Sequence, residues 1–153
     1  MQERLDPFAA APDLIRQMIA FSMAAESAGL ESSLLKLVKI RASQINGCAI
    51  CLKMHTGEAR HAGETEERIY MLDAWRESPL YTPRERAALA WTDTLTRLAD
   101  SGASDADYAA LAAEFSPEEQ VKLTVVIGVI NSWNRLGVGF RRHTVPVFSK
   151  AAA

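Results

Sequence analysis

The stretch SPEEQVKLTVVIGVINSWNRLG, residues 116–137, decides the fold class of this chain. Ser116, Pro117 and Glu119 form a helix start signal, because the serine hydroxyl can cap the first turn and the glutamate can cap the serine amide in return. The run TVVIGVI at residues 124–130 is rich in β-branched residues and could form a strand, but no partner strand is visible elsewhere. We therefore predict a helix whose apolar middle is buried on most sides or lies in a subunit interface.

The rest of the chain also reads as helices separated by short turns. Pro12, Gly29, the Asn46-Gly47 pair, Gly63 and the Thr82-Pro83 pair start or stop helical patterns. Helices are predicted over residues 12–28, 34–45, 48–61, 65–72, 82–100, 105–115 and 116–137. The apolar residues of 34–45 fall on or near one stripe, and Asp105 is expected to cap the helix 105–115. The sequence thus predicts an all-α fold of about six to seven helices in a single domain, residues 1–153.

Composition and charge limit the possible partners and compartments. There are 17 Lys and Arg residues against 19 Asp and Glu residues, the formal net charge is -2, and no long basic run argues for nucleic acid. The N-terminus lacks the apolar core of a signal peptide, and no apolar stretch approaches the ~18 residues of a membrane span. We expect a cytoplasmic protein without a membrane partner. In that compartment a close cysteine pair is more often catalytic or metal-binding than a structural disulfide.

Both cysteines lie in INGCAICLKMH, residues 45–55. On a helix Cys48, Cys51 and His55 share one face, within an arc of roughly 60°. His55 is one turn from Cys51 and can accept its proton. Asn46 as the helix cap would place Cys48 in the first turn, where the helix end favours a thiolate. Two thiols on one turn can also close into a disulfide, so the pair can complete a two-electron reduction cycle.

Spacing alone leaves two other interpretations of this segment open. Two thiolates and an imidazole are ligands that zinc prefers, but a structural zinc site has four ligands and the fourth is missing locally. The cysteines could also be small buried residues with His55 as a polar neighbour. Outside the segment, His61 and His143 are isolated, and we expect surface or capping roles for them. Three polar residues of the apolar helix, Asn131, Ser132 and Asn134, need hydrogen-bond partners, across subunits or beside the cysteines.

The segment ASQINGCAICLKMHTGEARHAGETEERI, residues 42–69, resembles the signature of the alkylhydroperoxidase D-like (AhpD-like) proteins in the carboxymuconolactone decarboxylase superfamily. Three further stretches of this chain resemble the opening, central and C-terminal helices of the family. They are RLDPFAAAPDLIRQMIAF, YTPRERAALAWTDTLTRLA and FSPEEQVKLTVVIGVINSWNRLGVGF. The resemblance implies an AhpD-like helical fold, a homo-oligomer of three or six chains, and thiol peroxidase activity. It implies that Cys51 attacks the hydroperoxide, Cys48 resolves and His55 is the base, with re-reduction by a dithiol protein. We predict neither a cofactor nor a metal.

One position departs from the family pattern. Members with the full proton relay commonly place a glutamate twelve residues before the first cysteine, where this chain has Lys36. An ammonium cannot accept a proton, although its charge could lower a thiol pKa. Glu58, on the same helical face as His55, is a possible substitute. The alternative is a solvated glutamate, or one paired with Arg41 or Lys53.

The sequence therefore predicts a thiol-dependent peroxidase or disulfide oxidoreductase, similar to alkyl hydroperoxide reductases, that reduces hydroperoxides through its CxxC pair. A non-catalytic oligomer or small-ligand-binding protein that kept the fold is the alternative that Lys36 supports. A non-redox reaction on a lactone-like substrate is known for relatives without the cysteine pair, and the intact pair argues against it here.

Overall fold

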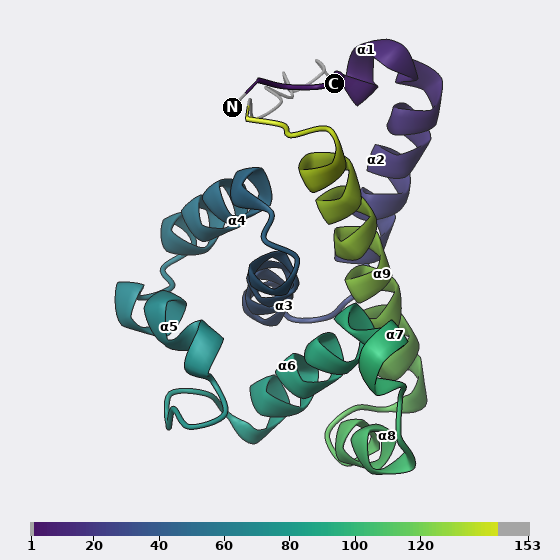
Figure 1. Cartoon of the computed structure of the whole chain (residues 1–153). Coiled ribbons are helices and arrows are strands. Elements are labelled where there is room, and N and C mark those ends of the chain that lie inside the picture. The colour runs from purple at the N-terminus through teal and green to yellow at the C-terminus, as the bar shows by residue number, and fades with distance from the viewer. Residues whose placement is uncertain (1, 144–153) are drawn as a thin grey trace.

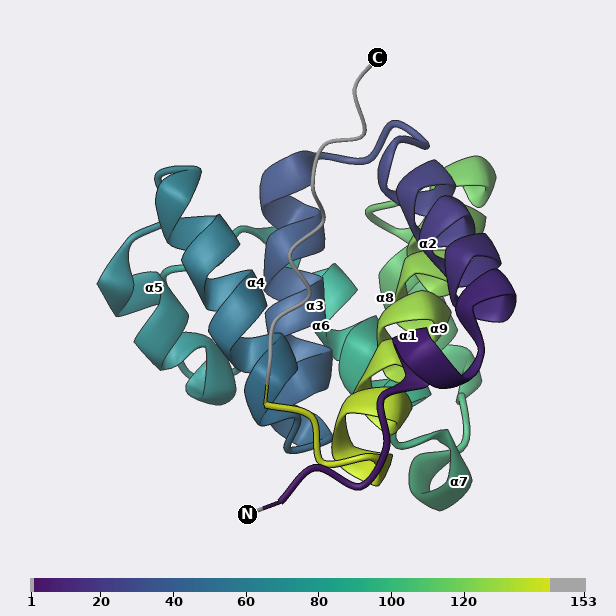
Figure 2. The ribbon, with the colours of Figure 1, turned by 90° about the horizontal axis from the view of Figure 1, so that it is seen from above.

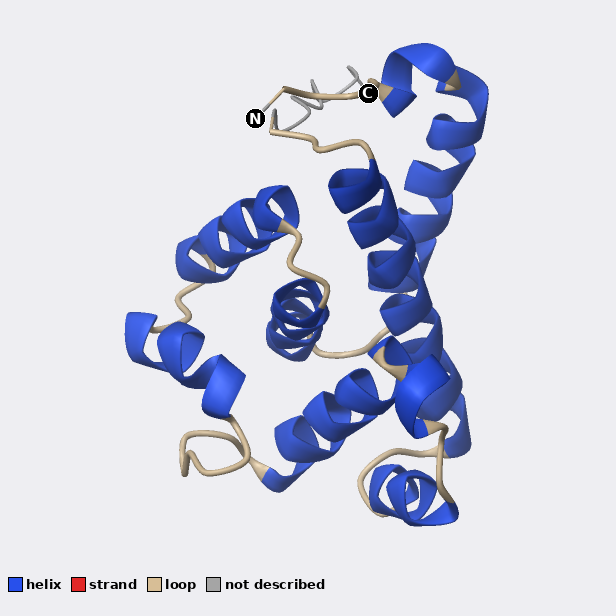
Figure 3. Ribbon diagram, viewed as in Figure 1, coloured by secondary structure: helices blue, strands red, loops and turns tan. Residues whose placement is uncertain are grey.

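The computed structural model describes residues 2–143; residue 1 and residues 144–153, the two ends of the predicted domain, lie outside the described part. Every regular element between residues 2 and 143 is a helix (Figure 3). In order, they are α1 (Pro7–Ala10), α2 (Pro12–Glu26), α3 (Ser32–Ile45), α4 (Ala49–His61), α5 (Glu66–Met71), the 3₁₀ helix η1 (Leu72–Ala74), α6 (Pro83–Thr96), α7 (Leu98–Ser101), α8 (Asp105–Ala112) and α9 (Pro117–Gly139). The all-α prediction is confirmed, and so is the helical interpretation of residues 124–130.

The predicted number of six to seven helices is too low, because the described residues hold nine α-helices and one 3₁₀ helix. The one-turn helix α1 starts where the Asp6 side chain accepts a hydrogen bond from the Phe8 amide. The predicted helix 82–100 breaks at Arg97, whose φ of -106° and ψ of 28° leave the helical region. Ser104, not Asp105, caps α8, and Asp107 completes a capping box with it.

Helix α3 lies at the centre of the molecule, with α4, α6 and α9 packed around it (Figure 1). Turned by 90°, Figure 2 shows α4 and α5 on one side of α3, and α9 and α2 on the other. Leu34, Leu35 and Val38 join a core with α6, α8 and α9, whereas Leu37 and Ile40 join a second core with α4, α5 and α6. The predicted stripe is buried but accounts for only part of the buried surface, because helices cover α3 on almost every side.

A buried charge network ties α3 to α6. The Arg41 Nε donates to Asp93 Oδ1 at 2.6 Å, and its Nη1 donates to Asp73 Oδ1 at 2.5 Å. Arg76 and the Trp75 indole nitrogen donate to the second Asp93 oxygen. Burial by itself would raise the pKa of Asp93, but the hydrogen bonds from Arg41 and Arg76 outweigh it and hold that pKa below its ordinary value. Asp93 therefore stays ionised in the interior.

Helix α9 has one buried side that changes character along its length. Its first half buries Leu123, Val126, Ile127 and Ile130, and its second half buries Asn131, Asn134 and Gly137. The opposite side faces α2, where Met18, Phe21, Val125, Gly128, Val129 and Ser132 line a groove of about 360 Å³. The last of these buried residues, Gly137, lies beside the cysteines.

None of the helices in residues 2–143 combines the length and apolar character that crossing a bilayer requires.

Candidate functional site

The turn from α3 to α4 places Cys48. Gly47, with φ of +64°, ends α3, since its amide donates to Gln44 O at 3.1 Å and the Cys48 amide donates to Ser43 O at 3.0 Å. Cys48 is extended, and its carbonyl accepts the first hydrogen bond of α4. Cys48 is thus the N-cap of α4, and the prediction that Asn46 caps this helix is wrong. Asn46 is instead the C-cap of α3, and the left-handed Gly47 and the extended Cys48 that follow it reverse the chain.

The two cysteines form a disulfide across the first turn of α4, with their Cα atoms 5.3 Å apart. Cys48 is 1% exposed and Cys51 is 5% exposed in the single chain. The positive end of the α4 dipole favours a thiolate at this place when the pair is reduced, whereas the burial favours a neutral thiol. Both cysteines are buried, as the alternative interpretation expected, but they are bonded to each other and are not separate thiols.

The last turns of α9 close over the disulfide at Gly137. A Cβ atom built on Gly137 would lie 2.7 Å from Cys48 Sγ, 3.2 Å from Ile50 Cγ2 and 3.5 Å from Cys51 Sγ. Only a hydrogen fits in that space. Gly137 is not predicted as a site residue from the sequence. The predicted helix 116–137 ends at this glycine, where it looks like an ordinary helix stop, but α9 continues to Gly139. A glycine inside a helix costs roughly 1 kcal/mol relative to alanine and so calls for a packing reason.

Two asparagines earlier on α9 hold the turn before the cysteines. The Asn46 Nδ2 donates to Asn131 Oδ1 and to Asn134 Oδ1, both at 2.9 Å. The Asn134 Nδ2 donates to Ser43 Oγ at 3.0 Å, so both α3 and the turn are bonded to α9. The predicted need of these asparagines for partners is confirmed, and the partners lie within the chain, beside the cysteines.

The buried His55 lies one turn after Cys51 and pairs with Glu58. The distance from His55 Nδ1 to Glu58 Oε2 is 2.9 Å. The hydrogen bond from His55 lowers the pKa of Glu58, and the positive charges of Lys39 and Lys36 act in the same direction against partial burial. An ionised carboxylate only accepts hydrogen bonds, so the Nδ1 atom carries a proton, and in the neutral form of the ring Nε2 has the lone pair. No hydrogen bond joins Nε2 to either sulfur within residues 2–143.

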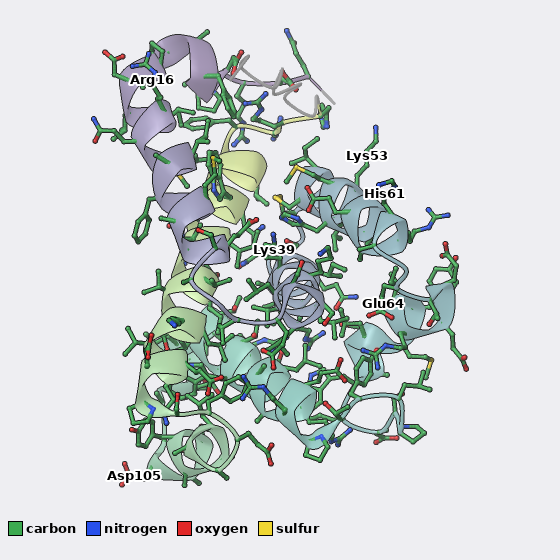
Figure 4. The ribbon with its side chains drawn as sticks, turned by 180° about the vertical axis from the view of Figure 1, so that it is seen from behind. Arg16, Lys39, Lys53, His61, Glu64 and Asp105 are labelled. Carbon is green, nitrogen blue, oxygen red and sulfur yellow. A yellow bond between two sulfur atoms is a disulfide. The ribbon has the colours of Figure 1, made fainter. Side chains whose placement is uncertain are left out.

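Lysines approach this pair from α3 without bonding to it. The Lys36 Nζ donates to Ser32 Oγ at 2.5 Å, one turn back on its own helix. The Lys39 Nζ forms an ion pair with Glu26 Oε1 at 2.7 Å. Figure 4 shows Lys39 on central α3 and Lys53 on the outer side of α4. Lys36 therefore adds charge near Glu58 but takes no part in a hydrogen-bonded relay.

The structure thus pairs Cys48 with Cys51 at the start of α4, and His55 with Glu58 further along the same helix. The suggested pairing of Glu58 with Arg41 or Lys53 is wrong, because Glu58 bonds His55 and Arg41 bonds Asp93. The isolated His61 and His143 are exposed, as predicted. In the part of the chain that the structure describes, no group of three or more His, Cys, Asp or Glu side chains could hold a metal ion.

Residues 12–94 match the carboxymuconolactone decarboxylase family. The uncharacterized protein YdfG of Bacillus subtilis is 37% identical over 138 residues, which are 90% of this chain and 94% of YdfG. This relative brings no known activity for comparison, but its sequence matches nearly the whole chain.

Solved structures agree with this relationship. A protein of unknown function from Agrobacterium tumefaciens, suggested to be the antioxidant defence protein AhpD, is 46% identical with a TM-score of 0.91, and the match covers 95% of this chain and 100% of that one. The debrominase Bmp8 has a TM-score of 0.80 at 18% identity over 89% of this chain and 73% of its own, a likeness of fold alone. The family match and these relatives show that the chain belongs to the carboxymuconolactone decarboxylase family and has the AhpD-like fold.

Proposed function

We propose that this protein reduces hydroperoxides at the expense of a dithiol, by cycling Cys48 and Cys51 between dithiol and disulfide. The observation that carries the proposal is the disulfide at the start of α4, one helical turn from a histidine that a carboxylate orients. A disulfide is the oxidised end of such a cycle, and an oriented imidazole supplies the proton transfers that the cycle needs.

The first step oxidises one sulfur. His55 Nε2 takes the thiol proton of Cys51, and the thiolate attacks one oxygen of the hydroperoxide. An S–O bond forms as the O–O bond breaks, and the proton returns from His55 to the departing alkoxide, which leaves as an alcohol. Cys51 suits this step better than Cys48, because it precedes His55 by one turn and its side chain is the more exposed of the two.

The later steps restore the thiols. The Cys48 sulfur attacks the sulfur of the Cys51 sulfenic acid, the S–S bond forms as the S–O bond breaks, and the departing hydroxide takes the proton of the Cys48 thiol and leaves as water. A dithiol protein then reduces the disulfide by two exchange reactions and becomes a disulfide itself. In total, one hydroperoxide and one dithiol give one alcohol, one water and one disulfide. The cycle requires neither a cofactor nor a metal, and a dithiol reductant of this kind fits the cytoplasm.

Glu58 orients His55 in place of the family's glutamate on α3, whose position is occupied here by Lys36. A glutamate on α3 would orient the histidine from a neighbouring helix, whereas Glu58 does so from one turn further along α4 itself. Lys36 and Lys39 favour the ionised form of Glu58, so the substitution on α3 supports this arrangement electrostatically. Proton transfer is therefore retained with a lysine at position 36.

The experiment is hydroperoxide-dependent oxidation of dithiothreitol by the wild-type protein, by Cys51→Ser and by Cys48→Ser. Wild type should consume one dithiol per hydroperoxide, and Cys51→Ser should lose the activity. Cys48→Ser should react once with hydroperoxide and stop at the sulfenic acid, which dimedone labels. Equal rates for wild type and Cys51→Ser would remove the proposed function.

A non-catalytic binding protein is the second candidate, favoured by the nearly complete burial of both sulfurs. Titration of the reduced protein by alkylation rate separates the two. Thiol pKa values near the unperturbed ~8.5 for both cysteines would support the binding protein. A depressed value for either cysteine supports the peroxidase.

We further propose that the protein is a homo-oligomer of three or six chains. Leu14, Phe21, Met23 and Val121 are large apolar side chains of α2 and α9 that are exposed in the single chain. Apolar surface of this kind commonly marks a contact with another protein. Light scattering should give three or six times the 16.8 kDa chain mass, and a monomer at micromolar concentration would contradict the assembly.

A further inference from the structure

We propose that Gly137 is a positioning residue that sets the redox equilibrium of the Cys48–Cys51 pair. Helix α9 leaves room for the bonded sulfurs only because this position has no side chain. The inference rests on that part of the proposed function in which the pair cycles between disulfide and dithiol. It does not depend on which oxidant closes the disulfide.

The space at Gly137 is too small for a methyl group while the disulfide is present. A Cβ atom there would be 2.7 Å from Cys48 Sγ, whereas non-bonded heavy atoms settle at about 3.5–4.0 Å. Ile50 Cγ2 at 3.2 Å closes a second side of the same space. An alanine at this position must therefore displace either the sulfur or the helix by roughly 1 Å.

The helix is bonded on both sides of Gly137 and resists that displacement. Asn134, one turn earlier, is bonded to Asn46 and Ser43. Just beyond Gly137, the Arg4 side chain donates to Gly139 O and the Arg4 amide donates to Phe140 O, both at 2.9 Å. The N-terminal segment and the turn before α4 thus hold the end of α9 in place, and the displacement falls on the Cys48 sulfur.

The two redox states differ in how freely that sulfur can move. In the disulfide, Cys48 Sγ is bonded to Cys51 Sγ, so it cannot change rotamer without breaking the bond. In the dithiol it can rotate about the Cα–Cβ bond to another staggered position. A methyl group at position 137 therefore disfavours the disulfide more than the dithiol. The reaction that shifts is disulfide plus two glutathione to dithiol plus oxidised glutathione.

The test is equilibration of wild type, Gly137→Ala and Gly139→Ala in glutathione redox buffers, followed by alkylation and mass spectrometry. Gly139 lies two residues further on the same helix, and a Cβ there meets nothing within 4 Å, so Gly139→Ala is the matched control. Overpacking of this size should shift the Gly137→Ala equilibrium toward the dithiol by about tenfold or more, which is ~30 mV. The Gly139→Ala curve should coincide with wild type. A Gly137→Ala curve within about twofold of wild type, or an equal shift in both variants, overturns the proposal.

Cys48→Ala/Gly137→Ala keeps the test decisive if Gly137→Ala alone does not fold. Removing the sulfur should make room for the new methyl group, so the double variant should be as stable as Cys48→Ala. A double variant that also fails to fold would show that Gly137 is needed for helix packing alone, which overturns the proposal. If the wild-type pair is reduced and oxidised in glutathione buffers but the protein does not turn over hydroperoxide, the proposed peroxidase activity is excluded and this test remains valid. A wild-type pair that glutathione never reduces overturns both.

Discussion

Replacing Glu58 by glutamine removes the charge that orients His55 while keeping a side chain of the same shape. The carboxylate accepts the Nδ1 proton at 2.9 Å, which leaves Nε2 as the base for Cys51. Glutamine is neutral, and its amide can also donate to Nδ1, which would place the ring proton on Nε2. The variant should therefore transfer the thiol proton less well.

The expected loss follows from the strength of this hydrogen bond. A bond to a charged acceptor is worth about 1.5–3 kcal/mol and a neutral one about 0.5–1.5 kcal/mol, a difference of roughly 1 kcal/mol. The Glu58 side chain is 47% exposed, so solvent screening keeps the difference at the low end. One kcal/mol corresponds to about fivefold in rate. We expect Glu58→Gln to react with hydroperoxide about three- to fivefold more slowly at neutral pH.

The assay is stopped-flow oxidation of the reduced protein by cumene hydroperoxide between pH 5 and pH 9. Glu67→Gln, which removes the same charge from an exposed position on α5, is the control and should match wild type. Glu58→Gln should need a higher pH to reach half its maximal rate, because the imidazolium that forms when His55 takes the thiol proton is then stabilised less. Identical rates and pH profiles for wild type and Glu58→Gln would refute the orienting role.

Three further predictions concern stability. Arg41→Leu should lower the free energy of unfolding by about 3 kcal/mol in urea titrations, because it leaves Asp93 buried with fewer partners; a loss under about 1 kcal/mol would contradict this. Because the pKa of Asp93 is lowered, its contribution is present above about pH 4 and lost as the pH falls through the folded value. The stability difference between wild type and Asp93→Asn should shrink in acid, and a constant difference would argue against it. Gly57→Ala, in the exposed middle of α4, should raise the melting temperature by about 2–4 °C.

The local signals in the sequence predict most helices and the cysteine motif. Thr82 and Ser116 cap their helices as their spacing indicates, because a cap needs only partners three residues away. The shared face of Cys51, His55 and Glu58 is likewise a property of one helix. Short elements such as α1 and α7 are not predicted, since a single turn carries too little pattern to distinguish it from a loop.

Which helix is the most enclosed by the others could not be predicted from local signals. The apolar run of α9 predicts a helix buried on most sides or in a subunit interface, yet within the single chain α3, with its lysines and arginine, is the helix enclosed on nearly all sides. Lys39 and Arg41 are tolerated there because Glu26 and Asp93 reach them from other helices. Burial depends on which helices pack together, and residues far apart in the chain decide that.

The sequence by itself therefore determined that the chain is helical and that two thiols and a histidine lie on one helix, because hydrogen bonds and capping act within about four residues. Only the tertiary structure decided that Gly137 meets the Cys48 sulfur and that Asn131 and Asn134 hold the preceding turn. These contacts join α9 to the turn between α3 and α4 across more than eighty residues of chain, a separation that no local pattern encodes.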